Sequence, residues 1–392
     1  MITPDAVKGA AQHAVKRARG NVRPRAAHNG PARVKPPAQR GSVATTSPPD
    51  ERNRRTLTDA ASAQKGARPE DLLLYADRSV VVLNKPRNLI SQLSQSRMVR
   101  KLPESIRDIQ QMLGLKEDLR TVHRLDKPTT GVILLAKTGK AAREMASQIY
   151  EKKIRKTYLA LVLGGASDFP EAEGVMKTLL ECRGGRVRSV DSGEPIAPLE
   201  AAGDSWLKDA VTEYRVLSTS PKVPLSLLSL DLVTGRKHQI RAQLAQHLRT
   251  PILFDPIFGD RGRSLEVARA LKGNFTHSLY LHASRITCIR YCRLRRPKQV
   301  RLSIGAPLPV AFVRACRAAG IPLDVDQLTG GVWINDTKVR GVLGSVNGSH
   351  EDVSRTSHEG GVREDVEDVI QDLGGRWYGP TELPPPSEYQ GP

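Results

Sequence analysis

His123-Arg124-Leu125-Asp126-Lys127-Pro128-Thr129-Thr130-Gly131 leads directly into an apolar run that ends at Lys137. A continuous apolar run of this length is typical of a buried strand. A carboxylate on the turn before such a strand and next to an arginine stays ionised, because the neighbouring cation favours the charged form. Asp126 is therefore a candidate carboxylate nucleophile. The residues alone leave an alternative open, in which Asp126 only turns the chain, with Pro128 and Gly131 as turn residues.

The surrounding sequence alternates short apolar runs with helical patterns. Strands are expected at residues 72–75, 79–84, 131–137, 158–163, 211–217 and 225–232. Helices are expected at residues 105–115, 141–153 and 237–247, the second of them capped by Thr138. Residues 164–210 are rich in Gly and Pro and are expected to form loops and short strands. Because hairpins join many of the strands, the pattern favours an α+β or mixed sheet over a doubly wound one.

Two further segments carry side chains suited to catalysis or binding. Lys156-Thr157-Tyr158-Leu159-Ala160-Leu161-Val162 reads as a strand whose tyrosine is able to stack on a base or pass a proton. A half-buried structural tyrosine is the alternative. Thr234-Gly235-Arg236-Lys237-His238-Gln239-Ile240-Arg241 places polar and cationic side chains at a helix start, where backbone N–H groups also favour an anion. A solvated helix face is the alternative there.

Taken in order, these segments resemble one enzyme family. The succession of NKP (84–86), HRLDxxTxG (123–131), KxYxAxV (156–162) and LxxGRxHQIR (232–241) is similar to the RluA-type pseudouridine synthases. The resemblance covers about residues 71–323. It implies the α+β catalytic fold of that family, a mixed and mostly antiparallel sheet with flanking helices around a central RNA-binding cleft. It also implies isomerisation of a uridine in RNA to pseudouridine, with no cofactor and no metal.

The resemblance also implies roles for individual residues. Asp126 corresponds to the catalytic aspartate, which attacks the ribose or the base of the target uridine. Tyr158 corresponds to the active-site tyrosine that packs against the uracil, and Arg241 to the basic residue that pairs with the aspartate. Arg124 corresponds to the arginine that fills the space left by the flipped nucleotide. The expected substrate-binding residues are Arg124, His123, Arg236, His238 and Gln239.

The sequence departs from the family pattern at several positions. Thr130 replaces the usual serine before Gly131, and Asn88 replaces a glycine but tolerates a left-handed backbone. Gln243 stands where a histidine is usual and keeps the capacity to hydrogen-bond. Phe254-Asp255 stands where the family has Gly-Asp. We expect the site to survive these changes.

Charge and composition divide the 392 residues into three parts. Residues 1–66 are basic and poor in large apolar side chains, which predicts a disordered arm or an organellar transit segment. Residues 67–323 are expected to form the catalytic domain. Residues 324–392 are expected to form an acidic, disordered tail, because from Gly341 onward ten acidic residues face three arginines. The formal net charge of +20 over the whole chain favours a polyanionic partner.

The predicted partner is RNA, with ribosomal RNA ahead of tRNA. A basic hairpin around residues 285–301 is a candidate track for phosphates, a solvated strand pair being the alternative. No membrane association is expected, because no window approaches the apolar length of a span, and the protein is expected to be monomeric. The predicted substrate is mitochondrial large-subunit rRNA, which places the protein in the mitochondrion. The alternatives are a tRNA enzyme of the cytoplasm or nucleus, and a non-catalytic RNA-binding or ribosome-assembly protein.

Overall fold

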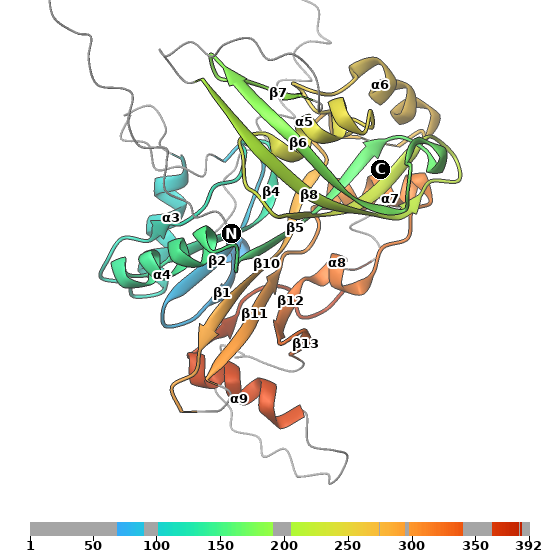
Figure 1. Cartoon of the computed structure of the whole chain (residues 1–392). Helices are drawn as coiled ribbons and strands as arrows, with labels where there is room; N and C mark the ends of the chain where they lie inside the picture. Colours follow the sequence, from blue (N-terminus) through green and yellow to red (C-terminus); the bar gives the residue numbers. More distant parts are fainter. Residues whose placement is uncertain are drawn as a thin grey trace, which may run out of the picture. The chain divides into compact units, whose positions relative to one another are not determined.

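The computed structural model describes residues 69–89, 101–190, 205–273, 275–294, 298–339, 363–383 and 385. All of them belong to the compact unit Ala63–Pro392 (Figure 1). Its helices are α2 (Pro69–Leu72), α3 (Lys101–Met112), α4 (Gly139–Tyr150), α5 (Gln239–Ala242), α6 (Arg261–Ala270), α7 (Val310–Ala319), α8 (Val325–Thr329) and α9 (Arg363–Leu373). A 3-10 turn, η1, covers Ala166–Asp168, and a π-helical turn, η2, covers Gln243–His247.

The strands make one large sheet. They are β1 (Leu73–Ala76), β2 (Val80–Lys85), β3 (Arg120–Thr121), β4 (Thr130–Ala136), β5 (Arg155–Leu163), β6 (Glu173–Arg183), β7 (Arg186–Val190), β8 (Trp206–Thr219), β9 (Leu225–Leu232), β10 (Leu281–Tyr291), β11 (Gln299–Gly305), β12 (Gly331–Ile334), β13 (Thr337–Lys338) and β14 (Arg376–Trp377).

The order of the strands brings distant parts of the chain together. The main path runs β14-β1-β2-β4-β10-β5-β9-β8-β6-β7, and β11, β12 and β13 continue from β10. Among the described strands, only the pair of β4 and β10 is parallel. The expected α+β fold with a mixed, mostly antiparallel sheet is confirmed. The two segments with the HRLD and KxYxAxV motifs lie at β4 and β5, which flank β10 at the centre of the sheet.

Helices bury both faces of the sheet around β2 and β4. Successive residues of a strand point to opposite faces, and Ile133 packs in one core cluster while Leu134 packs in the other. On the first face α3 belongs to the same core cluster as Ile133, and on the second face α4 and α9 belong to the same cluster as Leu134. Buried on both sides, β4 therefore reads as a continuous apolar run rather than as an alternating one.

The predicted strands and helices are confirmed in the HRLD region and in the LxxGRxHQIR region. Thr138 caps α4, and its Oγ1 accepts a hydrogen bond from the N–H of Ala141 at 3.1 Å. The expectation of loops and short strands over residues 164–210 is wrong, because β6 and β8 pair along ten residue positions. Apolar and polar residues only partly alternate along β6, since one of its faces is exposed, and the sequence signal is correspondingly weak.

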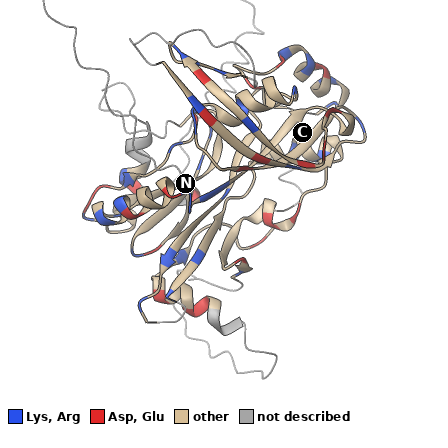
Figure 2. Cartoon of the chain, in the orientation of Figure 1, with Lys and Arg blue, Asp and Glu red and all other residues tan. Residues whose placement is uncertain are grey.

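The expectation of a disordered tail over residues 324–392 is wrong for the part that the structure describes. β12 extends the sheet next to β11, and β14 pairs with β1 at the opposite edge. The acidic helix α9, visible in Figure 2, buries a stripe of apolar side chains at helical spacing. That stripe comprises Val366, Val369, Ile370 and Leu373. Acidic composition concealed this amphipathic pattern.

The predicted arm over residues 1–66 lies outside the described residues, as do residues 340–362 and 386–392 of the predicted tail. None of the helices that the structure describes is both long enough and apolar enough to cross a membrane.

The junction between β4 and β10 requires a glycine. Gly131 has φ +106°, and a Cβ added there would lie 2.1 Å from the carbonyl oxygen of Ala283. His282 is fully buried in the same junction, and its Nδ1 lies 2.9 Å from Thr130 Oγ1. Burial lowers the pKa of His282 to about 4. Thr130, which follows the HRLD motif at the start of β4, therefore contacts a neutral imidazole.

This buried histidine makes the fold sensitive to acid. Between pH 6.5 and 4 the unfolded chain binds a proton at His282 that the folded chain does not, so the free energy of unfolding falls as the pH falls. From pH 7.5 to pH 5 the expected loss from this residue is about 2 kcal/mol. His282→Gln should lessen the loss by that amount, measured by urea unfolding at both pH values. An unchanged difference in the variant would show that His282 does not titrate as described.

Candidate active site

Asp126 lies on the turn that leads into β4. Its side chain is 16% exposed, and its carbonyl oxygen accepts a hydrogen bond from the N–H of Thr129 at 3.1 Å. Lys85 at the end of β2 stabilises the same turn, because its Nζ donates a hydrogen bond to the carbonyl oxygen of Lys127 at 3.2 Å. Burial lowers the pKa of Lys85 to about 7, while Asp126 opposes the change. The backbone around the carboxylate is therefore fixed from inside the fold.

Arg241 of α5 contacts the carboxylate directly. Its Nη1 donates to Asp126 Oδ2 at 3.1 Å. Its Nε and Nη2 donate to the two carboxylate oxygens of Asp255, at 2.8 and 2.7 Å. Burial acts to lower the pKa of Arg241, but Asp255 and Asp126 outweigh it and raise the pKa. A permanently charged guanidinium thus lies in direct contact with the carboxylate.

Asp255 is the residue that orients this arginine. It is buried, and besides the paired contact to Arg241 its Oδ1 accepts hydrogen bonds from the N–H groups of Ile257 and Phe258, at 2.8 and 3.1 Å. The ring of Phe258 lies 5.5 Å from the guanidinium carbon of Arg241. Two protein groups therefore fix the guanidinium and leave Nη1 to donate to Asp126. No local sequence pattern predicts this role, because 14 residues separate Arg241 from Asp255.

Tyr158 on β5 lines the same pocket as Asp126. It is 6% exposed, and burial, reinforced by Asp126, raises its pKa well above the usual value for tyrosine. Its phenol is therefore neutral, and the residue forms part of the pocket wall. The three predicted catalytic residues, Asp126, Tyr158 and Arg241, meet in one place although 115 residues separate the first from the last.

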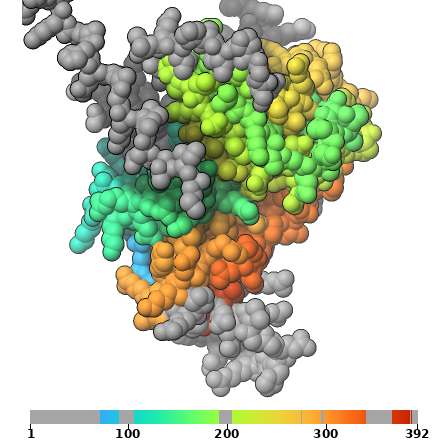
Figure 3. Space-filling model, in the orientation of Figure 1, coloured from blue at the N-terminus to red at the C-terminus, as the bar shows by residue number. Residues whose placement is uncertain are grey.

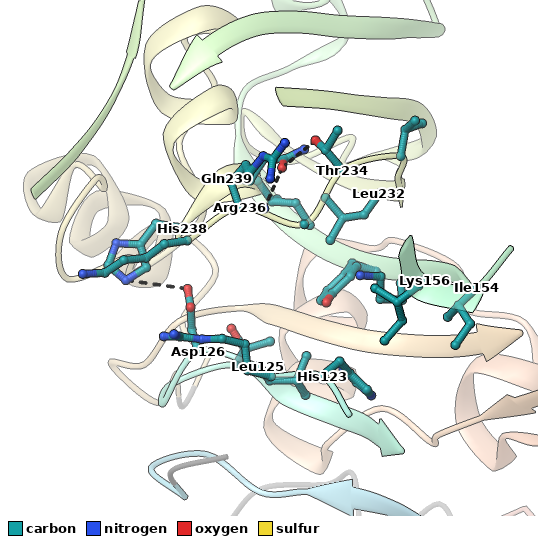
Figure 4. Close-up of a pocket in the computed structure, with 18 of the residues that line it drawn as sticks. His123, Leu125, Asp126, Ile154, Lys156, Leu232, Thr234, Arg236, His238 and Gln239 are labelled. Atoms are coloured by element: carbon teal, nitrogen blue, oxygen red, sulfur yellow. Dashed lines mark hydrogen bonds and ion pairs between the residues drawn. The ribbon is translucent and has the colours of Figure 1, made fainter. Parts of the chain in front are cut away.

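His238 approaches the carboxylate from the other side. Its Nε2 lies 3.9 Å from Asp126 Oδ2, as the dashed line in Figure 4 shows. The residue has φ +55°, and its ring stands edge-on to Phe258 at 5.8 Å between centroids. Burial lowers its pKa, although Asp126 opposes this effect. His238 is thus placed to contact a ligand that binds next to the Asp126 carboxylate.

The structure contradicts the expectation that Gln239 binds substrate. Its side-chain amide donates to the carbonyl oxygen of Val211 and to Thr212 Oγ1, at 3.0 and 2.8 Å. Its Oε1 accepts hydrogen bonds from Thr234 Oγ1 and from the N–H of Arg236, at 2.8 and 3.0 Å. Because both donors and both lone pairs are used within the protein, this buried residue fastens the GRxHQIR loop to β8.

The cations at the start of α5 are also engaged by the protein. Arg236 Nε donates to the carbonyl oxygen of Asp209 at 3.1 Å, and Lys237 Nζ donates to that of Gly185 at 2.9 Å. Arg236 lines the pocket with the rest of its exposed side chain. The predicted anion site at this helix start is not supported, since α5 has only four residues.

The two remaining predicted residues differ in their surroundings. His123 Nε2 accepts a hydrogen bond from the N–H of Leu134 at 2.9 Å, and burial followed by the charge of Lys156 lowers its pKa to about 3. Its imidazole is therefore neutral and is joined to the backbone of β4, and the residue also lines the pocket. Arg124 is exposed at the wall of the pocket.

These side chains surround a pocket of about 680 Å³. Its walls come from residues 122–158 on one side and residues 206–241 on the other, which form neighbouring teal and yellow-green regions in Figure 3. A volume of this size suits a small ligand or one nucleotide. Among the described residues, no group of three or more His, Cys, Asp or Glu side chains is arranged to hold a metal ion.

Several cations of the basic hairpin of β10 and β11, the predicted phosphate track, have partners within the protein. Arg290 is buried and paired with Asp77, with 3.1 Å between Nη2 and Oδ2. The guanidinium of Arg285 stacks at 3.8 Å on the ring of Trp333. Arg301 pairs with Asp336 at 2.6 Å. Acidic and aromatic partners that lie far away in the sequence therefore use these cations.

Comparison with known proteins gives consistent matches. The family model described as RNA pseudouridylate synthase matches residues 79–246. The tRNA pseudouridine synthase C of Salmonella typhimurium is 34% identical over 227 residues, which are 55% of this chain and 78% of that protein. The ribosomal large subunit pseudouridine synthase C of Escherichia coli is 33% identical over 224 residues, 56% of this chain and 63% of that protein. The solved structure of human RNA pseudouridylate synthase domain containing 4 has a TM-score of 0.49 and 24% identity, and covers 69% of this chain and 98% of that one.

Proposed function

The chain belongs to the RluA-type family of RNA pseudouridine synthases, and we propose that Asp126 is its nucleophile and mitochondrial large-subunit ribosomal RNA its substrate. The observation that carries the assignment of Asp126 is its contact with Arg241 at 3.1 Å, inside a pocket that Tyr158 also lines. A carboxylate in direct contact with a guanidinium, in a pocket that a buried tyrosine also lines, suits attack on a nucleotide flipped out of its stack.

The reaction rearranges the uridine without changing its composition. Asp126 attacks the ribose or the uracil, and the bond between N1 and C1′ breaks. The released uracil turns and C5 bonds to C1′, while the bond that Asp126 formed breaks and the free carboxylate returns. The proton on C5 leaves to solvent, and N1 takes up a proton. Arg241 keeps the attacking carboxylate charged and aimed, while the ring of Tyr158 packs on the uracil so that it does not diffuse away.

Relatives that are named for two different classes of RNA match the chain about equally well. The two relatives described above, one named for tRNA and the other for the ribosomal large subunit, are 34% and 33% identical to this chain, which does not separate the substrates. The basic arm over residues 1–66 supports delivery to an organelle, because it is rich in arginine and poor in acidic residues. A tRNA of the cytoplasm or nucleus is the second candidate substrate.

The test is pseudouridine mapping in cells that lack this protein. We expect one or more pseudouridines to disappear from mitochondrial large-subunit rRNA, and to return with the wild-type chain. Loss confined to tRNA would contradict the proposed substrate.

Imaging of a tagged chain tests the targeting role of residues 1–60. The full chain should lie in the mitochondrion and the chain without these residues outside it, and an unchanged location would contradict the targeting role of the arm.

A further inference from the structure

Lys156 is a cation in the pocket whose role the mechanism does not explain. It lies on β5 two residues before Tyr158, and Figure 4 shows it at the end of the pocket away from Asp126 and His238. Its side chain is half-buried and lines the pocket. Among the described residues, its ammonium group has no hydrogen-bond or ion-pair partner. The wall of the pocket thus holds a charge that the protein itself leaves uncompensated.

The backbone of the GRxHQIR loop makes room for this ammonium. A Cβ added to Gly235 would lie 3.1 Å from Lys156 Nζ. Burial lowers the pKa of Lys156, and its charge in turn helps to keep His123 neutral. Asp126 does not neutralise it, because that carboxylate is bonded to Arg241. A buried cation without a partner is costly, and an anionic ligand would remove that cost.

We propose that Lys156 binds a backbone phosphate of the RNA strand next to the flipped uridine. The inference rests on the proposed function, since it takes the pocket as the place that receives the uridine. A phosphate compensates a half-buried ammonium better than an uncharged uracil carbonyl does, and phosphates are the anionic groups of an RNA strand.

Two further side chains that line the pocket fit a nucleic-acid strand. Lys208 and Trp206 on β8 also line it, and Lys208 Nζ lies 5.6 Å from the centroid of the Trp206 ring. Basic groups beside an exposed or half-exposed aromatic ring are typical of surfaces that bind single-stranded RNA. A strand bound in this pocket would therefore meet Asp126 and Lys156 at different ends of it (Figure 4) and also contact the side chains of β8.

Binding of a short RNA tests the site directly. The probe is a fluorescein-labelled single-stranded RNA of nine nucleotides with one central uridine, titrated with full-length protein at several salt concentrations. Lys156→Met should weaken binding about fivefold to tenfold at low salt and reduce the slope of log affinity against log salt by about 0.7, the loss of one phosphate contact. Lys140→Met is the matched control, because Lys140 is exposed on α4 outside the pocket. It should change neither value. Circular dichroism melting verifies that both variants fold.

Methylphosphonate substitution identifies the bound group. Neutral methylphosphonate linkages are placed in turn on the two sides of the uridine. We expect one of them to weaken binding to the wild type as much as Lys156→Met does, and to have no further effect on the variant. Additive losses would assign Lys156 to a group other than that phosphate and would overturn the proposal, as would unchanged binding of Lys156→Met.

The same experiments separate this inference from the proposed function. If the wild type forms pseudouridine but Lys156→Met binds the probe normally, the phosphate site is wrong and the enzyme assignment stands. If the phosphate effect appears but Asp126→Asn retains wild-type activity, the anion site stands and the proposed nucleophile is wrong.

Discussion

Asp126→Asn lowers the rate of pseudouridine formation at least about a thousandfold while RNA binding stays within about threefold of the wild type, if the carboxylate is the nucleophile. The amide has nearly the shape of the carboxylate, and its oxygen is still able to accept the hydrogen bond from Arg241. It lacks the charge and the nucleophilic oxygen that attack requires. Single-turnover rates with saturating enzyme measure the chemical step, and anisotropy measures binding.

A matched control separates loss of the nucleophile from loss of charge. Asp260→Asn removes a carboxylate at the start of α6, where the side chain accepts a hydrogen bond from the N–H of Arg263 at 3.0 Å. Because Asn caps a helix about as well as Asp does, this variant should keep wild-type activity and stability. Activity of Asp126→Asn close to that of Asp260→Asn would rule out Asp126 as the nucleophile.

Asp255→Asn has the second largest expected effect and acts through Arg241. The change replaces one side of a buried, paired ion contact, so the guanidinium loses most of its compensation. Breaking a buried pair in this way costs about 3 kcal/mol in the free energy of unfolding. A guanidinium that shifts by about 1 Å also misplaces the Asp126 carboxylate, and a shift of that size costs about a hundredfold in rate.

Stability and rate must be measured separately for this variant. Urea unfolding gives the first, and single-turnover rates well below the melting temperature give the second. A purely structural role for Asp255 predicts lower stability with a wild-type rate, whereas a positioning role predicts a lower kcat with little change in KM. Wild-type values for both quantities would contradict the geometry described for Arg241. Asp260→Asn again serves as the control.

The centre of the fold and of the site could be predicted from the sequence, because each motif coincides with a single strand or helix or lies directly next to one. The HRLD motif precedes β4, the KxYxAxV motif is β5 itself, and β10 lies between them in the sheet. Each of the three predicted catalytic residues is thus close to a long apolar or helical signal, which fixes its surroundings. Local patterns were sufficient there.

Other parts of the site depend on contacts that no local pattern reveals. Gln239 is a polar residue of a kind that often binds ligands. Its four hydrogen bonds nevertheless all lie within the protein, and two of them go to β8. Asp255 appeared only as a departure from a family motif until its contact with Arg241 was seen. Lys156 looked like an ordinary residue of a strand. Whether a polar side chain serves the fold or a ligand depends on its tertiary partners.

The prediction of a disordered C-terminal tail was wrong for a different reason. Charge dominates the composition of residues 324–392, but α9 and β14 bury Ile370, Leu373 and Trp377 against the sheet. A few apolar residues at helical spacing are sufficient when a sheet face is available to receive them. The average composition of the segment does not reveal such a stripe of apolar residues.

Release of tritium from RNA that carries [5-³H]uridine tests the central claim most directly. Forming the new bond at C5 expels the hydrogen there, so each pseudouridine releases one tritium to solvent. With the RNA whose pseudouridine is lost in cells lacking the protein, we expect the purified wild type to release tritium in step with the pseudouridine that mapping detects. Asp126→Asn, bound to the same RNA, should release none above background. Release by the variant at the wild-type rate, or none by the wild type, would contradict the account of Asp126 and Arg241 as the centre of this enzyme.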